Sequence, residues 1–469
     1  MLYAVRGVVQ FATYRAGTYD LAIFDQAVRG YSRFGAPLSH VKGQWRGPGA
    51  QLSVLADHFS PLLAVLAPAY WIHDGPETLI VAQAVLFALA AVPLWVFARR
   101  LVGVAGAYAV TVAYLVSWPI AAAVAFSFHE VAFTPLLTAL LFERFQAGRR
   151  RHALAIVVLL LLVKEDMGLF VAGFGAGTLL ARQGRRLGAG LVVGGLAAVW
   201  LTARVLIPAF GGTPDRYWYY GGLGPSPGAA AWFGLTRPLD AVAAVATPDA
   251  KLWTLLLLLA PLLFLPLRSP YVVAPLALLA LRMLATDPDA AGWWGMRFHY
   301  NAAVIMGLLC AAVDGCARLR GRSGPAFRTS ATVAMAAITV IVAAWSPWRD
   351  LANPAWSTPG PRAEAAAGAL RLVPDGALVE AANALGPNLS ARANVTVWAA
   401  KMALMPRRAP WIVADTASVQ PHFGSLDAQW GDLARLLRDG YLVVYACDGY
   451  LVLTVTVDDG PGRLGDRAG

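Results

Sequence analysis

The sequence predicts an α-helical polytopic membrane protein with about 10–11 transmembrane helices, followed by a small α/β domain outside the membrane. Hydrophobic residues make up 58% of the 469 positions and charged residues only 14%, whereas a soluble protein has about 45–50% and about 25%. This composition, with a mean hydropathy of +0.57, excludes a soluble globular enzyme and a disordered chain. Three cysteines are too few for a disulfide framework, and they lack metal-binding spacing.

Ten apolar stretches are candidates for the spans, because a hydrocarbon core about 30 Å thick needs roughly 20 residues of helix. They lie at 77–98, 101–119, 131–145, 153–163, 167–181, 187–209, 251–267, 270–285, 300–317 and 326–345. Several are shorter than this length, so we expect neighbouring helices or kinks to help them across. Segment 59–73 is apolar but short and carries two prolines, which predicts an interfacial or re-entrant segment.

The basic residues predict which loops face the cytoplasm. The net charge is +11, and membrane proteins collect Lys and Arg in their cytoplasmic loops. One set of alternating loops holds Arg99, Arg100, Arg144, Arg149, Arg150, Arg151, Arg182, Arg185, Arg186, Arg268, Arg318, Arg320, Arg322 and Arg328, and the other holds only Lys164, Arg216, Arg237, Lys251 and Arg297. The first set is predicted to be cytoplasmic. Because the basic runs are short and lie between apolar stretches, we expect no nucleic-acid partner.

The two ends of the chain differ from the middle. Residues 1–17 are short for a span, are interrupted by Arg6 and Arg15, and lack the apolar core of a signal peptide. We therefore expect a first span that is marginal or begins upstream, followed by a long first extracytoplasmic loop at about 13–76. We predict a multi-spanning membrane domain at 1–348 and an extracytoplasmic α/β domain at 349–469.

The second of these domains is predicted from short β-type runs. GALVEAA, NVTVWAA and PWIVADT are typical of strands, and DAQWGDLARLLRDG is typical of an amphipathic helix. YLVVYACDGYLVLTV predicts a hairpin that turns at Asp448 and Gly449.

Polar side chains beside the spans fall on the side opposite the cytoplasm. They are Asp20, Asp25, Asp57, His58, His129, Glu130, Lys164, Glu165, Asp166, Arg297 and His299. Each cluster alone is a weak signal, but five clusters on one membrane face favour a single extracytoplasmic site.

Asp20 and Asp25 lie in TYDLAIFDQAVRGYSRFG, whose apolar spacing predicts an amphipathic helix closed by Gly35. Asp20 is placed to cap this helix, and Asp25 precedes Arg29 by four residues, which is typical of a surface ion pair. The functional alternative is a general base that takes a proton from an acceptor hydroxyl. A rotation of about 140° separates the two carboxylates on a helix, so we do not expect one paired acid/base unit.

Two further clusters stand at the predicted membrane face. Asp57 and His58 either mark where the chain leaves the lipid, or coordinate a divalent cation or a phosphate-bearing substrate. His129 and Glu130 stand at a span entrance, and no second histidine follows at the spacing of a zinc protease.

The remaining clusters also have two interpretations. Lys164, Glu165 and Asp166 are either the tip of a hairpin between two short spans or charges that face protein, water or each other. Arg297 and His299 open a span after a tryptophan-rich loop and have the chemistry to bind a lipid-linked phosphate.

Several motifs together resemble a bacterial predicted-membrane-protein family of unknown function, over Tyr19 to about Val455. These are YDLAIFDQ, DHFSP, the KED interruption, RFHYN and ANALGPNLS. More distantly, the chain resembles the GT-C membrane glycosyltransferases in the order of its segments. An acid in a long first outer loop is followed by PLLAVLAPAYWIH and then by a span that ends in ARRL. The GT-C aspartate stands shortly before a hydrophobic/aromatic pair, so the resemblance implies a catalytic role for Asp20, before Ile23 and Phe24, with Asp25 second.

This resemblance implies an enzyme of the bacterial plasma membrane that moves a hexosyl or pentosyl group from a polyprenyl-phosphate carrier. Its partners would be the lipid bilayer, the polyprenyl-phosphate-linked sugar and an extracytoplasmic glycan, lipid or protein acceptor. Asp20 or Asp25 would be the base, and the substrate would be bound by His58, His129, Glu130, Lys164, Glu165, Arg297 and His299. A divalent cation, Mg or Mn, would be held by Asp57 and Asp166, although the chain lacks a clear DxD motif.

Two other functions stay open. A lipid-carrier or small-molecule transporter or flippase would bind at the bilayer midplane between internal repeats, and its acidic residues would line both faces. A non-catalytic cell-envelope assembly protein would have polar clusters that pair with each other and enclose no cavity.

Overall fold

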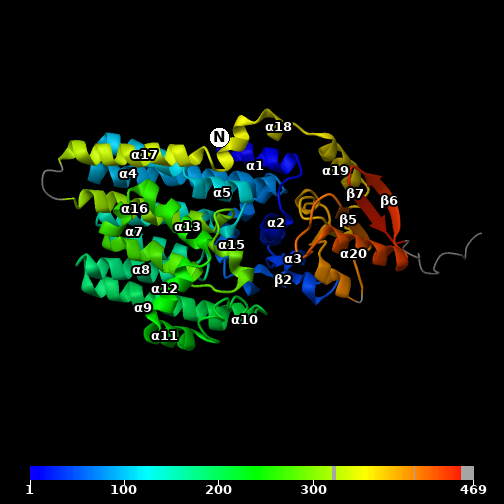
Figure 1. The fold of residues 1–469 in the computed structure, drawn as a ribbon, viewed down its shortest axis with the longest axis horizontal. Coiled ribbons are helices and arrows are strands. Elements are labelled where there is room, and N and C mark those ends of the chain that lie inside the picture. The colour runs from blue at the N-terminus through cyan, green and yellow to red at the C-terminus, as the bar shows by residue number, and fades with distance from the viewer. Residues whose placement is uncertain (320–323, 406, 456–469) are drawn as a thin grey trace, which may run out of the picture.

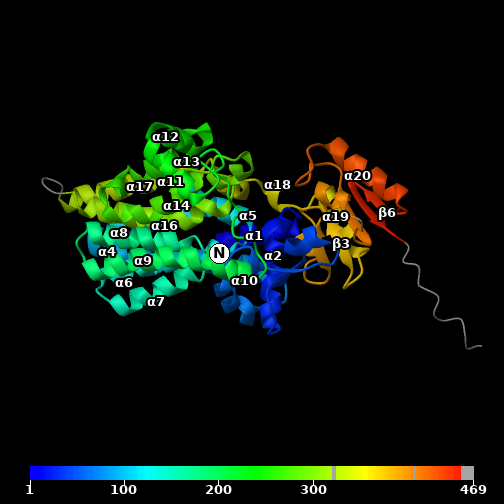
Figure 2. The ribbon, with the colours of Figure 1, turned by 90° about the horizontal axis from the view of Figure 1, so that it is seen from below.

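The computed structural model describes residues 1–319, 324–405 and 407–455. Helices from α4 (Glu77–Val116) to α17 (Pro325–Ala343) form an elongated body, and a sheet domain lies at one end of it (Figures 1 and 2). Arg320 and Arg322 of the predicted cytoplasmic set, and the last residues of the predicted outer domain, 456–469, lie outside the described residues.

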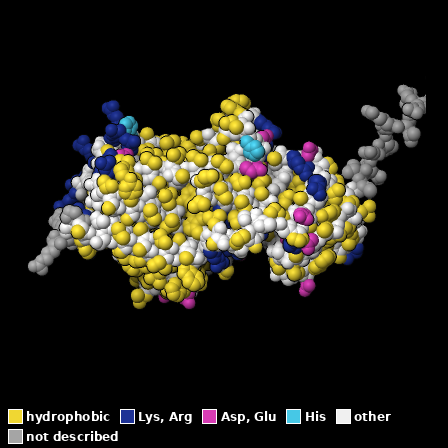
Figure 3. All heavy atoms as spheres, turned by 90° about the horizontal axis from the view of Figure 1, so that it is seen from above, with side chains coloured by type: hydrophobic (Ala, Val, Ile, Leu, Met, Phe, Trp, Pro, Cys, Tyr) yellow, Lys and Arg dark blue, Asp and Glu magenta, His cyan; other side chains and the backbone are white. Residues whose placement is uncertain are grey.

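Hydrophobic side chains cover much of the surface of the helical body. Figure 3 shows them as a broad area over the body, with Lys and Arg gathered at the end farthest from the sheet domain. This arrangement is typical of a body embedded in a bilayer. Which end faces the cytoplasm stays a prediction.

In the described part of the chain, four helical stretches are long and apolar enough to span a membrane by length and composition. They are Glu77–Phe126, Arg185–Ala209, His299–Ala317 and Ala326–Ala343, and the bent pair Pro238–Ala246 and Asp249–Leu262 makes five if it counts as one span. Other predicted spans form α6 (Phe133–Gln146), α7 (Arg150–Leu161), α8 (Met167–Leu180) and α14 (Val273–Met283). These have at most 14 residues, or about 21 Å of helix, so helix length alone does not establish the predicted 10–11 spans.

The longest stretch folds back on itself at Gly103, which has φ 80° and ψ 178°. Tyr114 donates a hydrogen bond to the carbonyl of Phe87 at 3.0 Å, and the rings of Trp95 and Tyr108 lie 5.7 Å apart. In a straight helix, Phe87 and Tyr114 would be about 40 Å apart. The two halves are therefore antiparallel neighbours, as predicted for stretches 77–98 and 101–119.

The first loop lies between the helical body and the sheet domain. The predicted amphipathic helix is α2 (Thr18–Ser32), which has a break at Tyr19 and Asp20. The helix ends at Ser32, earlier than the predicted end at Gly35. The residue with positive φ after it is Phe34, at 56°, and not Gly35. The predicted interfacial segment forms a 3₁₀ helix, η3 (Pro61–Trp71), which packs on α2 through a hydrogen bond from the Trp71 indole to the Ser32 carbonyl.

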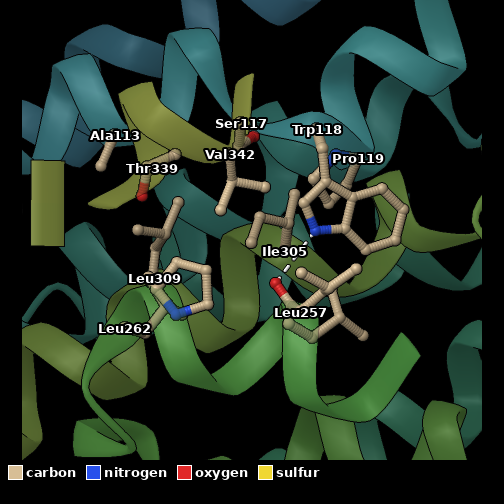
Figure 4. A pocket seen from close by; sticks show the side chains of 12 residues that line it. Ala113, Ser117, Trp118, Pro119, Leu257, Leu262, Ile305, Leu309, Thr339 and Val342 are labelled. Carbon is tan, nitrogen blue, oxygen red and sulfur yellow. Dashed lines mark hydrogen bonds between the residues drawn. The ribbon is translucent and has the colours of Figure 1, made fainter. Parts of the chain in front are cut away.

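Close packing fills the helical body between α5 (Trp118–Phe126), α13 (Asp249–Leu259), α16 (Ala302–Ala317) and α17. Figure 4 shows Trp118, Leu257 and Ile305 meeting there, with the Trp118 indole donating to the Leu257 carbonyl at 3.0 Å. The space left between them is about 10 Å³, room for at most one water. This region is core and offers no space for a substrate.

The sheet domain has five strands in the order β4-β3-β5-β7-β6. β3 (Leu378–Ala381) runs parallel to β4 (Asn394–Val397) and β5 (Trp411–Asp415), whereas β7 (Tyr450–Thr454) is antiparallel to β5 and β6 (Leu442–Cys447). The helices α19 (Pro361–Arg371) and α20 (Leu426–Arg438) complete it. The predicted strands, helix and hairpin are confirmed, and the turn uses φ 48° at Asp448 and 83° at Gly449, as a two-residue hairpin requires.

A buried ion cluster ties β3 to α20. Arg408 lies 2.6 Å from the carboxylate of Glu380 and 2.9 Å from that of Asp432, and the Trp398 indole donates to Asp432 at 2.8 Å. Glu380 is completely buried, so loss of Arg408 would remove the cation that contacts both carboxylates.

We expect the Arg408→Met variant to lower the free energy of unfolding by about 3–5 kcal/mol, the usual cost of breaking a buried ion pair. The measurement is thermal unfolding of the full chain in detergent. Arg407→Met is the matched control, since Arg407 is exposed. Equal melting temperatures for the two variants would contradict the role assigned to the cluster.

Candidate functional site

A cavity of about 530 Å³ lies where the first loop meets the helical body. Its volume is in the range of small-molecule and cofactor sites. Seven of the predicted site residues line it, namely Asp20, Asp57, His58, His129, Lys164, Glu165 and Asp166. These residues are far apart in the sequence, and the structure brings them together around one cavity.

The DHFSP and KED motifs contact each other directly. His58 Nδ1 lies 2.7 Å from a Glu165 carboxylate oxygen, and the backbone amide of Phe59 donates to the other oxygen at 3.1 Å. Burial lowers the pKa of His58, and the charge of Lys164 lowers it further. The carboxylates of Glu165 and Asp57 outweigh both effects and raise the pKa of His58 above its ordinary value. The pair thus places at the cavity wall an imidazole whose protonated form the neighbouring carboxylates favour.

Asp57 is surrounded by groups that stabilise its negative charge. Lys42 forms an ion pair with it, Arg216 Nη1 lies at 3.3 Å, and the Tyr217 hydroxyl donates to it at 2.5 Å. Burial alone would raise the pKa of Asp57, but Lys42, His58 and Arg216 hold it well below the ordinary value. Asp57 therefore organises three donors around the cavity.

A second buried chain of charges runs through Glu130, which is completely buried behind the cavity wall. Lys164 Nζ lies 3.0 Å from one of its oxygens, and His129 Nδ1 lies 2.6 Å from the other. Burial would raise the pKa of Glu130, but His129 and Lys164 hold it well below the ordinary value. Two interpretations were open for Lys164, Glu165 and Asp166: a hairpin tip, or charges that face protein, water or each other. The contacts of Lys164 favour the second, because its charge faces Glu130.

Two aromatic rings pack against the ring of His129. The ring of His299 stacks on it with centroids 3.6 Å apart, and Phe24 packs its ring edge-on at 5.1 Å. Its Nε2 lies 3.9 Å from an Asp20 carboxylate oxygen. His299 does not line the cavity but stands directly behind His129.

Asp20 occupies a strained position. Its φ is 70° and its ψ is −62°, and Tyr19 before it is extended. A non-glycine residue in this region costs about 1–3 kcal/mol and needs support from its surroundings. Among the described residues, no hydrogen bond joins the Asp20 side chain to the first amides of α2, so helix capping does not account for it.

The support comes from the ANALGPNLS segment of the sheet domain. The backbone amide and hydroxyl of Thr18 both donate to the Asn383 carbonyl at 2.6 Å, and the Tyr19 amide donates to the Asn383 side-chain oxygen at 3.3 Å. A Cβ at Gly386 would lie 2.2 Å from the Thr18 hydroxyl, so glycine is needed for this approach. The sheet domain thus holds the break that turns Asp20 toward the cavity.

Asp25 and Arg297 do not reach the cavity. Asp25 is completely buried and accepts two hydrogen bonds from Arg29, at 2.8 and 2.9 Å, and one from the Tyr70 hydroxyl at 2.8 Å. These contacts favour the ion-pair interpretation of Asp25. Arg297 is exposed and lies over the ring of Phe298.

Sequence reasoning missed several groups that line the cavity. They include Lys42, Arg204, Arg216, Tyr217 and Arg282. Arg282 donates to the Asn301 side chain at 3.2 Å, while its Nη2 is buried without a partner in the described part of the chain. An arginine inside the predicted span 270–285 was a signal that could have found it.

The predicted metal ligands, Asp57 and Asp166, are not the best placed for an ion. Asp57 is already surrounded by cations, and burial raises the pKa of Asp166 to about 6, against the opposing effect of Lys164. Within the described ranges, one group of three metal-ligating side chains has its ligand atoms within 4.8 Å of one another, namely Asp20, His129 and His299.

We expect Asn383→Ala to loosen the break at Asp20, because the Tyr19 amide loses its acceptor. A lost hydrogen bond of about 1 kcal/mol corresponds to roughly fivefold faster amide exchange. Hydrogen–deuterium exchange of the peptide that contains residues 17–21 measures it. Asn394→Ala is the control, since the hydrogen bond from the Asn394 side chain to the Gly376 carbonyl does not involve residues 17–21. Unchanged exchange in Asn383→Ala would contradict this role.

Comparison with known proteins supports the fold. No curated protein sequence matches the chain. A solved structure, ArnT from Cupriavidus metallidurans bound to undecaprenyl phosphate, aligns with a TM-score of 0.53 at 14% sequence identity, over 97% of this chain and 98% of ArnT. ArnT is a GT-C glycosyltransferase, so the distant GT-C resemblance of the sequence is confirmed at the level of the fold. Residues 12–452 match the family described as "Predicted membrane protein (DUF2079)", which confirms the predicted family of unknown function, and the chain belongs to this family of membrane proteins.

Proposed function

We propose that the protein is a GT-C-like glycosyltransferase that moves a sugar from a polyprenyl-phosphate carrier to an acceptor outside the membrane. One observation carries the proposal: a single cavity is lined by the Asp20 carboxylate and by cationic side chains from the first loop and the helical body. The carboxylate can accept the proton of the acceptor hydroxyl, and the cations can stabilise the negative charge of a phosphate. The ArnT-like fold supports a polyprenyl phosphate as the carrier.

The cavity has a wall suited to each part of such a substrate. Apolar side chains of Leu169, Val199, Ala203 and Ile207 line it, and an isoprenoid chain would lie against them. The phosphate would bind to Arg282, whose buried Nη2 lacks a partner among the described residues, and to neighbouring donors such as Arg216. Guanidinium groups bind phosphate through paired N–H donors.

In the proposed reaction, Asp20 accepts the proton of the acceptor hydroxyl as its oxygen attacks the anomeric carbon of the sugar. The bond between that carbon and the phosphate oxygen breaks, and the electron pair leaves with the polyprenyl phosphate. The cationic side chains stabilise the charge that the phosphate gains. Attack opposite the leaving group inverts the configuration at the anomeric carbon.

The same proposal places the protein in the bacterial plasma membrane as a multi-pass protein with its sheet domain extracytoplasmic. The acceptor, a glycan, lipid or protein, would then approach Asp20 from the sheet-domain side, where Asn383 holds the Tyr19–Asp20 break. A transporter is less well supported, because the polar residues surround one cavity. An assembly protein is less well supported, because the polar clusters line an open volume of about 530 Å³.

The test compares Asp20→Asn with wild type by mass spectrometry of the lipids that co-purify in mild detergent. We expect polyprenyl phosphate or its sugar conjugate on wild type, and accumulated conjugate on Asp20→Asn, because loss of a general base slows transfer by about 10²–10⁴-fold. Asp25→Asn should lower the melting temperature without this accumulation, since Asp25 is bound to Arg29. Ordinary phospholipids alone on both wild type and Asp20→Asn would overturn the proposal.

A further inference from the structure

Arg282 differs from the other Lys and Arg side chains that line the cavity. It is buried, with an exposed fraction of 7%, and in the described part of the chain it forms no ion pair with a carboxylate. Asp166 lines the same cavity but makes no such contact with it. The other basic side chains each contact a carboxylate: Lys42 and Arg216 contact Asp57, Lys164 contacts Glu130, and Arg204 contacts Asp215. An arginine inside a predicted span is expected to have a partner, and a charged one is not in contact with Arg282.

The groups that do contact Arg282 are neutral, and they hold one side of its guanidinium. Nη1 donates to the side-chain oxygen of Asn301 at 3.2 Å and to the Trp293 carbonyl at 3.4 Å. Nη2 is buried and has no hydrogen-bond partner among the described residues. The cavity that Arg282 lines is therefore the space from which a partner for its charge can come.

Asn301 is itself fixed on both sides of its amide. It is completely buried, its amide nitrogen donates to the Gly295 carbonyl at 3.1 Å, and its oxygen accepts from Arg282. An amide can make both bonds because it carries a donor and an acceptor. Trp293 and Gly295 lie in the tryptophan-rich loop before RFHYN, and Asn301 is the last residue of that motif. The loop and the motif thus hold Arg282 together.

We propose that Asn301 is a positioning residue, which holds Arg282 through a neutral oxygen so that the guanidinium binds the phosphate of the lipid-linked substrate. A carboxylate at position 301 would also accept from Nη1, but its negative charge would balance that of Arg282. The amide fixes the guanidinium and leaves its positive charge for a ligand. The inference rests on the proposed function, because it takes the phosphate of the carrier as that ligand.

The test measures binding of undecaprenyl phosphate to the full-length protein in detergent, from the rise in melting temperature with lipid concentration. A ligand that binds only the folded state raises this temperature. Wild type should respond to undecaprenyl phosphate and not to undecaprenol, which lacks the phosphate. Arg282→Met should bind at least tenfold more weakly, because the phosphate loses hydrogen bonds from a charged donor.

Two variants of Asn301 separate positioning from packing. Asn301→Asp should bind undecaprenyl phosphate at least tenfold more weakly, because the added charge balances that of Arg282. Asn301→Ala leaves Arg282 cationic and removes one contact that fixes it, so we expect binding about fivefold weaker than wild type. Both variants lose the bond to Gly295, so the difference between them reports the charge, and a merely structural role would not produce it. Asn353→Asp is the matched control, since Asn353 is exposed and its side chain accepts from the Ala355 amide.

Binding by Asn301→Asp as strong as that of wild type or of Asn301→Ala would overturn this inference. So would equal responses of wild type to the two lipids, or no response to either. Should Asn301→Asp not fold, unchanged binding in Asn301→Ala would overturn it. The transferase proposal is tested separately by the sugar conjugate on Asp20→Asn. No conjugate there, together with phosphate binding that depends on Arg282 and Asn301, would remove the transferase and leave the phosphate site.

Discussion

The buried ion chain from Lys164 through Glu130 to His129 is the contact on which the site depends. Glu130 has no exposure, so its charge depends on the two side chains beside it, Lys164 and His129. The chain joins the turn before α6 to the turn before α8, two segments more than 30 residues apart. It also fixes the ring of His129, and through ring stacking the ring of His299. Without this chain, the cavity wall would lose its charges and its geometry together.

Asp20 depends on a different part of the molecule. Its backbone is held by Asn383 and by the close approach of Gly386, both in the sheet domain, while its side chain faces a histidine of the helical body. The candidate base therefore lies at the junction of the two parts. A shift of the sheet domain would move Asp20 relative to His129, so this domain contributes to the site even though its own strands carry none of the cavity residues.

The sequence predicted what local patterns encode. Charges that interrupt apolar runs pointed to Asp57, His58, His129 and the KED segment, because burying a charged side chain near a membrane costs free energy unless the side chain faces protein or water. Alternating β-type runs and the Asp448–Gly449 turn predicted the sheet domain. Contacts between distant residues could not be predicted from such patterns. Arg216, for example, pairs with Asp57 across 159 positions. The positive φ of Asp20 likewise arises from the sheet domain, not from the residues beside it.

The cavity divides its charges in a way that suits the proposed transfer. Around Asp57, a carboxylate gathers Lys42, Arg216 and Tyr217 into one group of donors before any substrate binds. Around Asp20, the carboxylate lies 3.9 Å from Nε2 of His129. A phosphate is attracted to the first group, whereas an acceptor hydroxyl suits the Asp20 carboxylate. Because both groups are held by buried contacts, the donors need little reorganisation as charge moves from the acceptor oxygen to the phosphate, and such preorganisation is the main source of electrostatic stabilisation in enzymes.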